Sequence, residues 1–127
     1  MEKILTIYVN CTSTQEVISD NITVRQILFD GYARGKIFNG MILPGGVDTQ
    51  TISKDGAGTL NARYMLRGTD SCGDECMLYI ENTAEIGKSE TKPSIVTDSK
   101  NIGWVKTVDL VGQICDDDGL RIDIYVI

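Results

Sequence analysis

Short segments rich in β-branched and aromatic residues recur along almost the whole chain, and each ends at a turn signal such as Asp30-Gly31 or Asp55-Gly56. Residues of the first kind favour strands, and glycine, proline, asparagine and aspartate favour turns. The predicted strands cover Ile4–Val9, Ile22–Phe29, Lys36–Leu43, Val47–Ile52, Leu60–Leu66, Met77–Asn82, Thr107–Cys115 and Leu120–Ile127. Short strands at such close spacing are typical of an all-β sandwich or barrel.

Two parts of the chain give a weaker strand pattern. Thr83–Lys100 is polar and contains Pro93, so it is predicted mainly as a long loop with one short strand near Ser94–Val96. Asp98–Trp104 is predicted as a single helical turn. Asn39-Gly40 either forms a hairpin turn between two apolar runs or lies inside one strand, with glycine at a bulge.

One turn introduces a pair of polar residues. Leu43-Pro44-Gly45-Gly46 has proline in the second position and glycine in the third, which is the chemistry of a type II turn. Asp48 and Gln50 follow it two residues apart, so they project from the same face of a strand. We therefore expect the turn to deliver both polar side chains to one side of a sheet.

Size and charge indicate one acidic globular domain. The 127 residues are 42% hydrophobic and 24% charged, which fits a single domain over residues 1–127. The net charge of −6 argues against nucleic acid and anionic membrane surfaces as partners, because both attract basic proteins. No apolar stretch is long enough to span a bilayer, and the first apolar run is too short for a signal peptide, so a cytoplasmic location is expected.

The absence of histidine limits the possible chemistry. It excludes Ser-His-Asp and Cys-His catalysis as well as zinc sites built on histidine. Cys72 and Cys76 would need Cys11 and Cys115 to complete a zinc site, so no metal is expected, and no cofactor motif is found. The consecutive aspartates of Asp116–Asp118 lack the alternating spacing of a calcium loop and indicate an acidic turn.

Several predicted strands are apolar on both faces. Ile4–Val9 and Val105–Ile114 show no clean alternation, whereas a small barrel surrounded by water should carry polar residues on its outer face. Part of the outer face is therefore expected to be covered. A homodimer is the simplest cover, and a helix or loop is the alternative.

A longer set of residues resembles the signature of a known family. The matching positions are Gly31, Gly35, Phe38-x-Gly40-x-Ile42, Leu43–Gly46, Asp48, Gln50, Asp55-Gly56, Leu60-x-Ala62-Arg63-Tyr64-x-Leu66, Leu78-Tyr79-Ile80-x-Asn82, Pro93, Trp104 and Ile124-Tyr125. By these residues the chain is similar to domain of unknown function 3237, also called uncharacterised protein family 0311. The resemblance implies a closed, mostly antiparallel β-barrel, here of about eight strands, and favours one continuous strand through Asn39-Gly40. It implies no established reaction, ligand or cofactor.

Two features of this chain depart from the family pattern. The family often carries tryptophan between the aspartate and glutamine of the motif, and this chain has Thr49. The hairpin after Leu66 is longer than the usual turn and contains Cys72 and Cys76.

The candidate binding residues are the polar groups that we expect inside the barrel. They are Asp48, Gln50, Arg63, Tyr79 and Tyr125. Arg63 and Tyr64 lie on opposite faces of their strand, and Arg63 is expected inside because a guanidinium group can pair bidentately with Asp48.

Three functions fit this prediction. The first is binding of a small organic molecule in a polar barrel pocket. The second is a cofactor-free isomerase or cyclase with Asp48 as general base, although a neighbouring Arg63 would lower the pKa of Asp48 and oppose that role. The third is a structural module whose interior is filled by ion pairs and hydrogen bonds. A void lined by polar groups would support the first two, and a packed interior would support the third.

Overall fold

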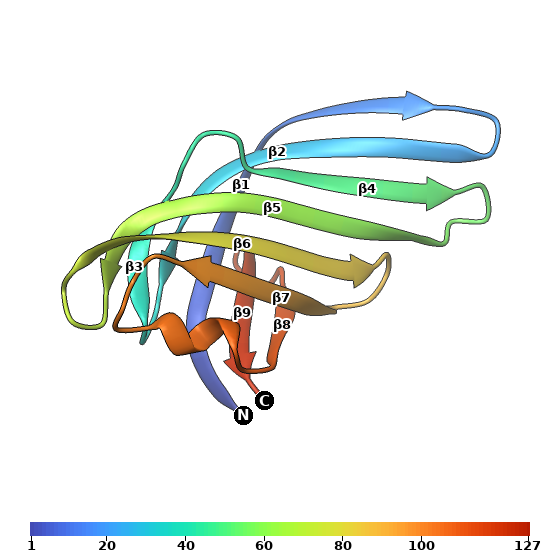
Figure 1. Ribbon diagram of the computed structural model, residues 1–127. Coiled ribbons are helices and arrows are strands. Elements are labelled where there is room, and N and C mark those ends of the chain that lie inside the picture. The colour runs from blue at the N-terminus through green and yellow to red at the C-terminus, as the bar shows by residue number, and fades with distance from the viewer.

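The computed structural model describes residues 1–127 and consists almost entirely of antiparallel strands (Figure 1). The strands are β1 (Glu2–Ile18), β2 (Ile22–Arg34), β3 (Phe38–Ile42), β4 (Val47–Ser53), β5 (Gly58–Asp70), β6 (Glu75–Glu85), β7 (Glu90–Thr97), β8 (Leu110–Cys115) and β9 (Leu120–Val126). One 3₁₀ helix, η1 (Gly103–Lys106), precedes β8. None of the helical structure is long and apolar enough to cross a membrane.

The strands close into a barrel with eight positions. The order around it is β1, β9, β8, β7, β6, β5, a position shared by β3 and β4, and β2, which pairs again with β1. β3 and β4 share a position because each pairs with β2 on one side and β5 on the other. The closed antiparallel barrel is thus confirmed, and Asn39-Gly40 lies inside β3.

The turn at Leu43–Gly46 is a small excursion within the shared position of β3 and β4. Gly45 has a φ of 111°, the left-handed conformation that the third residue of a type II turn requires. The chain does not reverse here, because β3 and β4 run in the same direction beside β5. β4 therefore begins directly after the excursion and carries Asp48 and Gln50 toward the opposite end of the barrel.

Two local predictions need correction. The loop expected over Thr83–Lys100 is mostly strand, since β6 continues to Glu85 and β7 covers the eight residues from Glu90 to Thr97. Pro93 is tolerated because β7 pairs with β8 only at Glu90 and Thr91, which leaves the rest of that edge unpaired. The helical turn lies at Gly103–Lys106, later than predicted.

One end of the barrel is filled with apolar side chains. The buried residues of this end are Leu5, Ile7, Phe38, Ile42, Leu66, Leu78, Ile80, Ile95, Ile102, Val105, Leu110 and Ile124. Ile102, directly before η1, is 1% exposed, and Val105, within η1, is 0% exposed. β7 and β8 share only two residue pairs, and η1 packs against β7 beside this short pairing.

A buried carboxylate ties the segment before η1 to the end of β5. Asp70 accepts hydrogen bonds from the Ser99 hydroxyl at 2.7 Å and the Asn101 side-chain amide at 2.9 Å. It also accepts the backbone N–H groups of Cys72 at 2.9 Å and Asp74 at 3.2 Å. These charge-assisted bonds hold Ser99 and Asn101, in the segment before η1, against the β5–β6 turn.

The stability of this end is expected to depend on pH. Hydrogen bonds from Asn101 and then Ser99 lower the pKa of Asp70 from 3.8 to about 2. A carboxyl group with a lowered folded pKa stabilises the fold above its unfolded pKa, and this contribution is lost as the pH falls through the folded pKa. Thermal melts should therefore show a loss between about pH 4 and pH 2 that is smaller in Asp70→Asn. Equal pH dependence of the two proteins would contradict this role.

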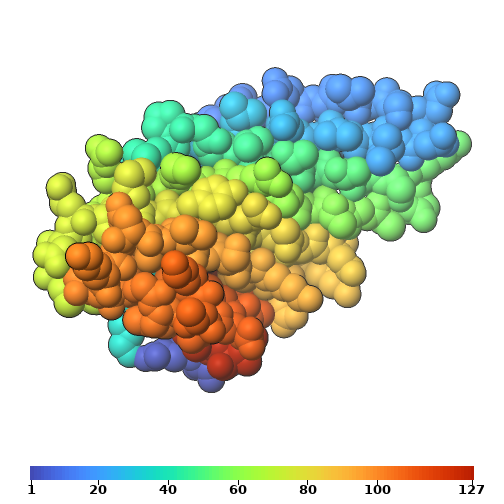
Figure 2. Space-filling model, viewed as in Figure 1, coloured from blue at the N-terminus to red at the C-terminus, as the bar shows by residue number.

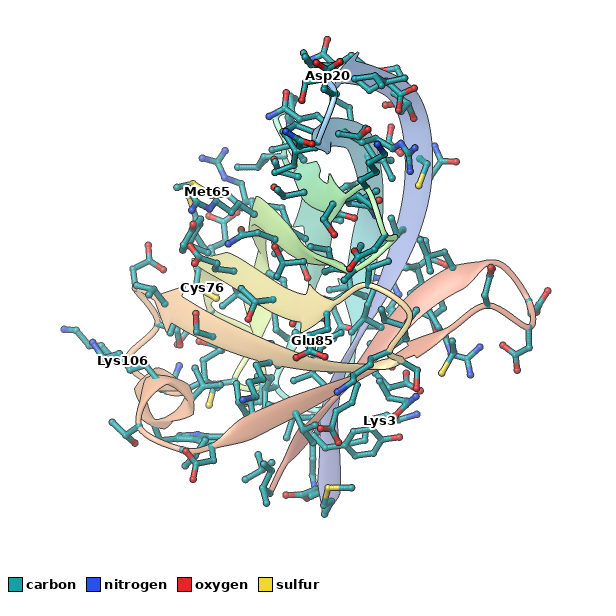
Figure 3. All side chains as sticks on the ribbon, turned by 90° about the vertical axis from the view of Figure 1, so that its right-hand side faces the viewer. Lys3, Asp20, Met65, Cys76, Glu85 and Lys106 are labelled. Carbon is teal, nitrogen blue, oxygen red and sulfur yellow. The ribbon has the colours of Figure 1, made fainter.

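The opposite end of the barrel is open and carries the hairpins. The β1–β2 and β4–β5 hairpins project to the right in Figure 1, and in Figure 2 they form an extension of the main body. A bulge between Cys11 and Ser13 interrupts the pairing of β1 where this projection begins. Figure 3 looks onto this side, with Asp20 at the tip of the β1–β2 hairpin and Glu85 at the end of β6.

The outer face of the sheet exposes several large apolar side chains. Met41, Met65 and Val96 are each more than half exposed. Tyr8 and Tyr32 stack nearby, with ring centroids 4.7 Å apart. A second copy of the chain could cover this face, and the homodimer stays a prediction. The cytoplasmic location also stays a prediction.

Candidate functional site

A cavity of about 210 Å³ lies inside the open half of the barrel. Its wall is mostly apolar and includes Val9, Phe29, Leu60, Ala62, Ile114 and Ile122. The polar side chains that reach it are Cys11, Asp48, Gln50, Tyr64 and Asn82. The barrel is therefore half filled. Apolar side chains fill the end that η1 covers, and the cavity lies at the end that carries the hairpins.

Asp48 and Gln50 share the inner face of β4, as their spacing predicted. Asp48 lies opposite Ile27 of β2 and Ala62 of β5, both of which also line the cavity. The Gln50 side-chain amide donates to Oδ2 of Asp48 at 3.0 Å. The other carboxylate oxygen, Oδ1, is buried without any hydrogen-bond partner. Asp48 thus presents an unused acceptor inside a mainly apolar space.

The surroundings make Asp48 a weaker acid than usual. Desolvation raises the pKa of its carboxyl group, and the hydrogen bond from Gln50 only partly opposes that rise. No lysine or arginine lines the cavity to favour the ionised form.

The predicted ion pair between Arg63 and Asp48 is wrong. The Arg63 side chain is 60% exposed and lies 3.4 Å from the carboxylate of Glu81. Its Nε also donates to the Asn61 side chain at 3.1 Å. Arg63 therefore belongs to the outer face of β5. Burying the Arg63 guanidinium in this apolar space would cost more free energy than pairing with the single carboxylate of Asp48 would return.

The two tyrosines chosen from the sequence also lie outside the barrel. Tyr79 alternates with the buried Leu78 and Ile80, and its hydroxyl donates to Glu81 at 3.0 Å. Tyr125 follows the buried Ile124 on β9 and does not line the cavity. Their predicted placement inside the barrel is therefore wrong, because each is out of phase with the apolar face of its strand.

Tyr64 and Asn82 occupy the inner positions instead. The Tyr64 ring packs edge-to-face against Phe29 at a centroid distance of 5.3 Å, and burial raises the pKa of its hydroxyl. Asn82 is 4% exposed, and its Oδ1 has no hydrogen-bond partner. Alternation alone could have found both, since Tyr64 is in phase with Leu66 and Asn82 with Ile80.

Cys11 brings a thiol to the cavity wall. Its pKa is raised by burial, then by the negative charges of Asp48 and Asp116. A raised pKa lowers the thiolate fraction, so the group is a poor nucleophile at neutral pH. Cys72 and Cys76 are free and do not line the cavity.

The chain is similar to proteins from Clostridium acetobutylicum and Penicillium herquei. A UPF0311 protein of Clostridium acetobutylicum is 34% identical over 84 residues, which are 64% of this chain and 51% of that protein, so the match spans about half of its length. A solved structure of a protein with unknown function from C. acetobutylicum has a TM-score of 0.84 at 26% identity, over 98% of this chain and 96% of the other. The structure of an enzyme from Penicillium herquei has a TM-score of 0.76 at 18% identity, over 98% and 92%, which shows the fold alone.

The family model matches the part of the chain that builds most of the cavity. The model described as protein of unknown function (DUF3237) covers residues 1–91. This range contains the Leu43–Gly46 turn together with Asp48, Gln50, Tyr64 and Asn82. The chain therefore belongs to the DUF3237 family.

Proposed function

We propose that the protein binds a small, largely apolar organic molecule in the cavity under the hairpins, with the polar end of the ligand at Asp48. The observation that carries this proposal is the buried Oδ1 of Asp48, which has no partner in a cavity of about 210 Å³. Buried polar atoms are nearly always hydrogen-bonded, because leaving one unpaired is costly. A ligand that donates to this oxygen would remove that cost.

The cavity also has the composition of a ligand site. Small-molecule pockets are mostly apolar, with a few polar groups that orient the ligand. Here Asp48, Gln50 and Asn82 supply the polar groups on an apolar wall. A purely structural module is less well supported, because such a barrel would be filled at both ends.

A second candidate function is proton transfer on a bound molecule by Asp48. The objection to this role was a neighbouring Arg63, and that side chain lies outside the barrel. Desolvation instead raises the pKa of Asp48, which is the direction that a general base near neutral pH requires. Turnover of a bound molecule that persisted in Asp48→Asn would remove Asp48 as the base.

Filling the cavity is expected to abolish binding. Ala62 lies between Asp48 and Asn82 in the strand register, so phenylalanine at position 62 would occupy the space between them. In a fragment screen by NMR, we expect fragments to shift resonances of Ala62, Tyr64 and Ile122 in the wild type. The same fragments should bind Ala62→Phe at least about tenfold more weakly, since the space they need is taken.

Thr51→Phe is the matched control, because Thr51 lies outside the cavity wall, on the opposite face of β4 from Gln50. It adds the same ring to the surface and should leave fragment binding unchanged. Equal binding by all three proteins, or no fragment shifting the cavity resonances, would refute the proposed site.

A further inference from the structure

We propose that the ligand carries a protonated amine, which binds between Asp48 and Asn82 beside the rings of Phe29 and Tyr64. This inference rests on the proposed binding function and specifies the chemistry of the ligand's polar end. It follows from the hydrogen bonds that the cavity leaves unmade, from its charge and from its aromatic wall.

The cavity contains two unused acceptors that flank one gap. Oδ1 of Asp48 and Oδ1 of Asn82 are both buried without hydrogen-bond partners. Asp48 pairs in register with Ala62, and Ala62 pairs with Asn82, so the backbones of Asp48 and Asn82 lie two strand spacings apart, about 10 Å, and their side chains flank Ala62. The small side chain of Ala62 leaves the gap between them open. An ammonium group has three donors and no acceptor, which suits such a gap.

The cavity also lacks a positive charge to balance Asp48. The nearby Arg25, which lies opposite Gln50, is paired with Glu16 at 2.9 Å. Arg63 is outside the barrel, in contact with Glu81. A desolvated carboxylate without a counter-ion is costly, and a bound cation would offset that cost where a neutral hydroxyl group could supply only a hydrogen bond.

Two aromatic rings complete the wall. Phe29 and Tyr64 both line the cavity, and they pack at an interplanar angle of 74°. Desolvated aromatic rings attract cations through their quadrupole, and this attraction favours an ammonium ligand over a carboxylate. A carboxylate would also meet Asp48 with like charge.

Binding of an amine should weaken as the pH falls. Asp48 faces Cys11 of β1 and Tyr64 of β5, whose pKa values are both raised, so both groups stay neutral from neutral to acidic pH. Asp48 is the only charged residue of the cavity wall, to which β6 contributes only the uncharged Asn82. Farther out, Arg25 of β2 is paired with Glu16 of β1, and Asp116 in the β8–β9 turn acts on Cys11. Protonation of Asp48, whose pKa is raised, would therefore remove the ligand's counter-charge.

Three ligands of similar size test the inference. We would titrate 2-phenylethylamine, 2-phenylethanol and 3-phenylpropanoate into the full chain by calorimetry and follow the cavity resonances by NMR. The amine is expected to bind at least about tenfold more tightly than the alcohol, because it adds an ion pair and a cation–π contact in a desolvated site. The carboxylate should bind more weakly than the alcohol.

The isosteric variant Asp48→Asn serves as the control for charge. Amine affinity should fall to about that of the alcohol, alcohol affinity should change less than about threefold, and the pH dependence of amine binding should disappear. The pH titration of the wild type gives a second measurement if the variant folds poorly. An alcohol that binds as tightly as the amine, or amine affinity unchanged in Asp48→Asn, would overturn the cation inference and leave the pocket intact. No binding of any of the three would overturn both.

Discussion

Substitution of Gly31 by alanine is expected to lower the free energy of unfolding by about 3–5 kcal/mol. Gly31 has a φ of 142°, which residues with a Cβ rarely adopt. A Cβ at this position would lie 1.9 Å from the carbonyl oxygen of Tyr8 on β1, and backbone cannot move aside as a flexible side chain can. The hydrogen-bonded pairing of β1 and β2 would have to separate around Gly31. Phe29, which lines the cavity, is on β2 only two residues away, so the cavity wall would be disturbed as well. Urea unfolding measures the effect.

Gly45→Ala separates backbone strain from the steric clash. Gly45 also has a left-handed φ, at 111°, but an added Cβ meets no atom within 4 Å. Its loss should be limited to conformational strain, about 1–2 kcal/mol. If the two variants lost equal stability, the contact with Tyr8 would not be the cause.

Phe38→Ala is expected to have a similarly large effect, a loss of about 3–5 kcal/mol. The Phe38 side chain is 0% exposed in the filled half of the barrel. It packs so closely on β3 that a Cβ at Gly40 would lie 2.6 Å from its ring. Removing the ring leaves a cavity that the closed sheet cannot collapse to fill. The measurement is again the free energy of unfolding in urea.

Met41→Ala provides the comparison on the same strand. Met41 is 58% exposed on the outer face, so its truncation should change stability by less than about 1 kcal/mol. A loss at Met41 as large as that at Phe38 would show that the outer face is buried in solution, as in the predicted homodimer.

Local sequence predicted part of the candidate site. The two-residue spacing of Asp48 and Gln50 placed them together, because side chains alternate along any strand. The same rule pointed to Tyr64, which is in phase with Leu60, Ala62 and Leu66. Arg63 was preferred for its chemistry as a partner of Asp48, and the preference failed because a buried guanidinium needs more compensation than one carboxylate provides. Alternation was the better guide.

The polar strand β7 was hidden for a different reason. Lys92 and Ser94 are exposed, whereas Thr91 and Ile95 are buried, so only every second residue of β7 faces the barrel interior. The buried positions include a polar threonine, which weakens the apolar alternation. Pro93 added a false loop signal, since proline is excluded from a strand only where its missing N–H would be needed. Whether the N–H at position 93 is needed depends on whether β8 pairs with that part of β7. The residues next to Pro93 in the sequence do not carry this information.

Residue patterns alone were enough to establish the all-β class, most strand positions, the turn before β4 and the common face of Asp48 and Gln50. These features depend on propensity and on the period of two, which act between residues close in the chain. The folded chain was needed to show that β3 and β4 share one position, that η1 covers one end, and that Asp48 and Asn82 flank Ala62 with no counter-ion for Asp48. Those features depend on the register between strands far apart in sequence, which barrel closure sets for the whole sheet at once.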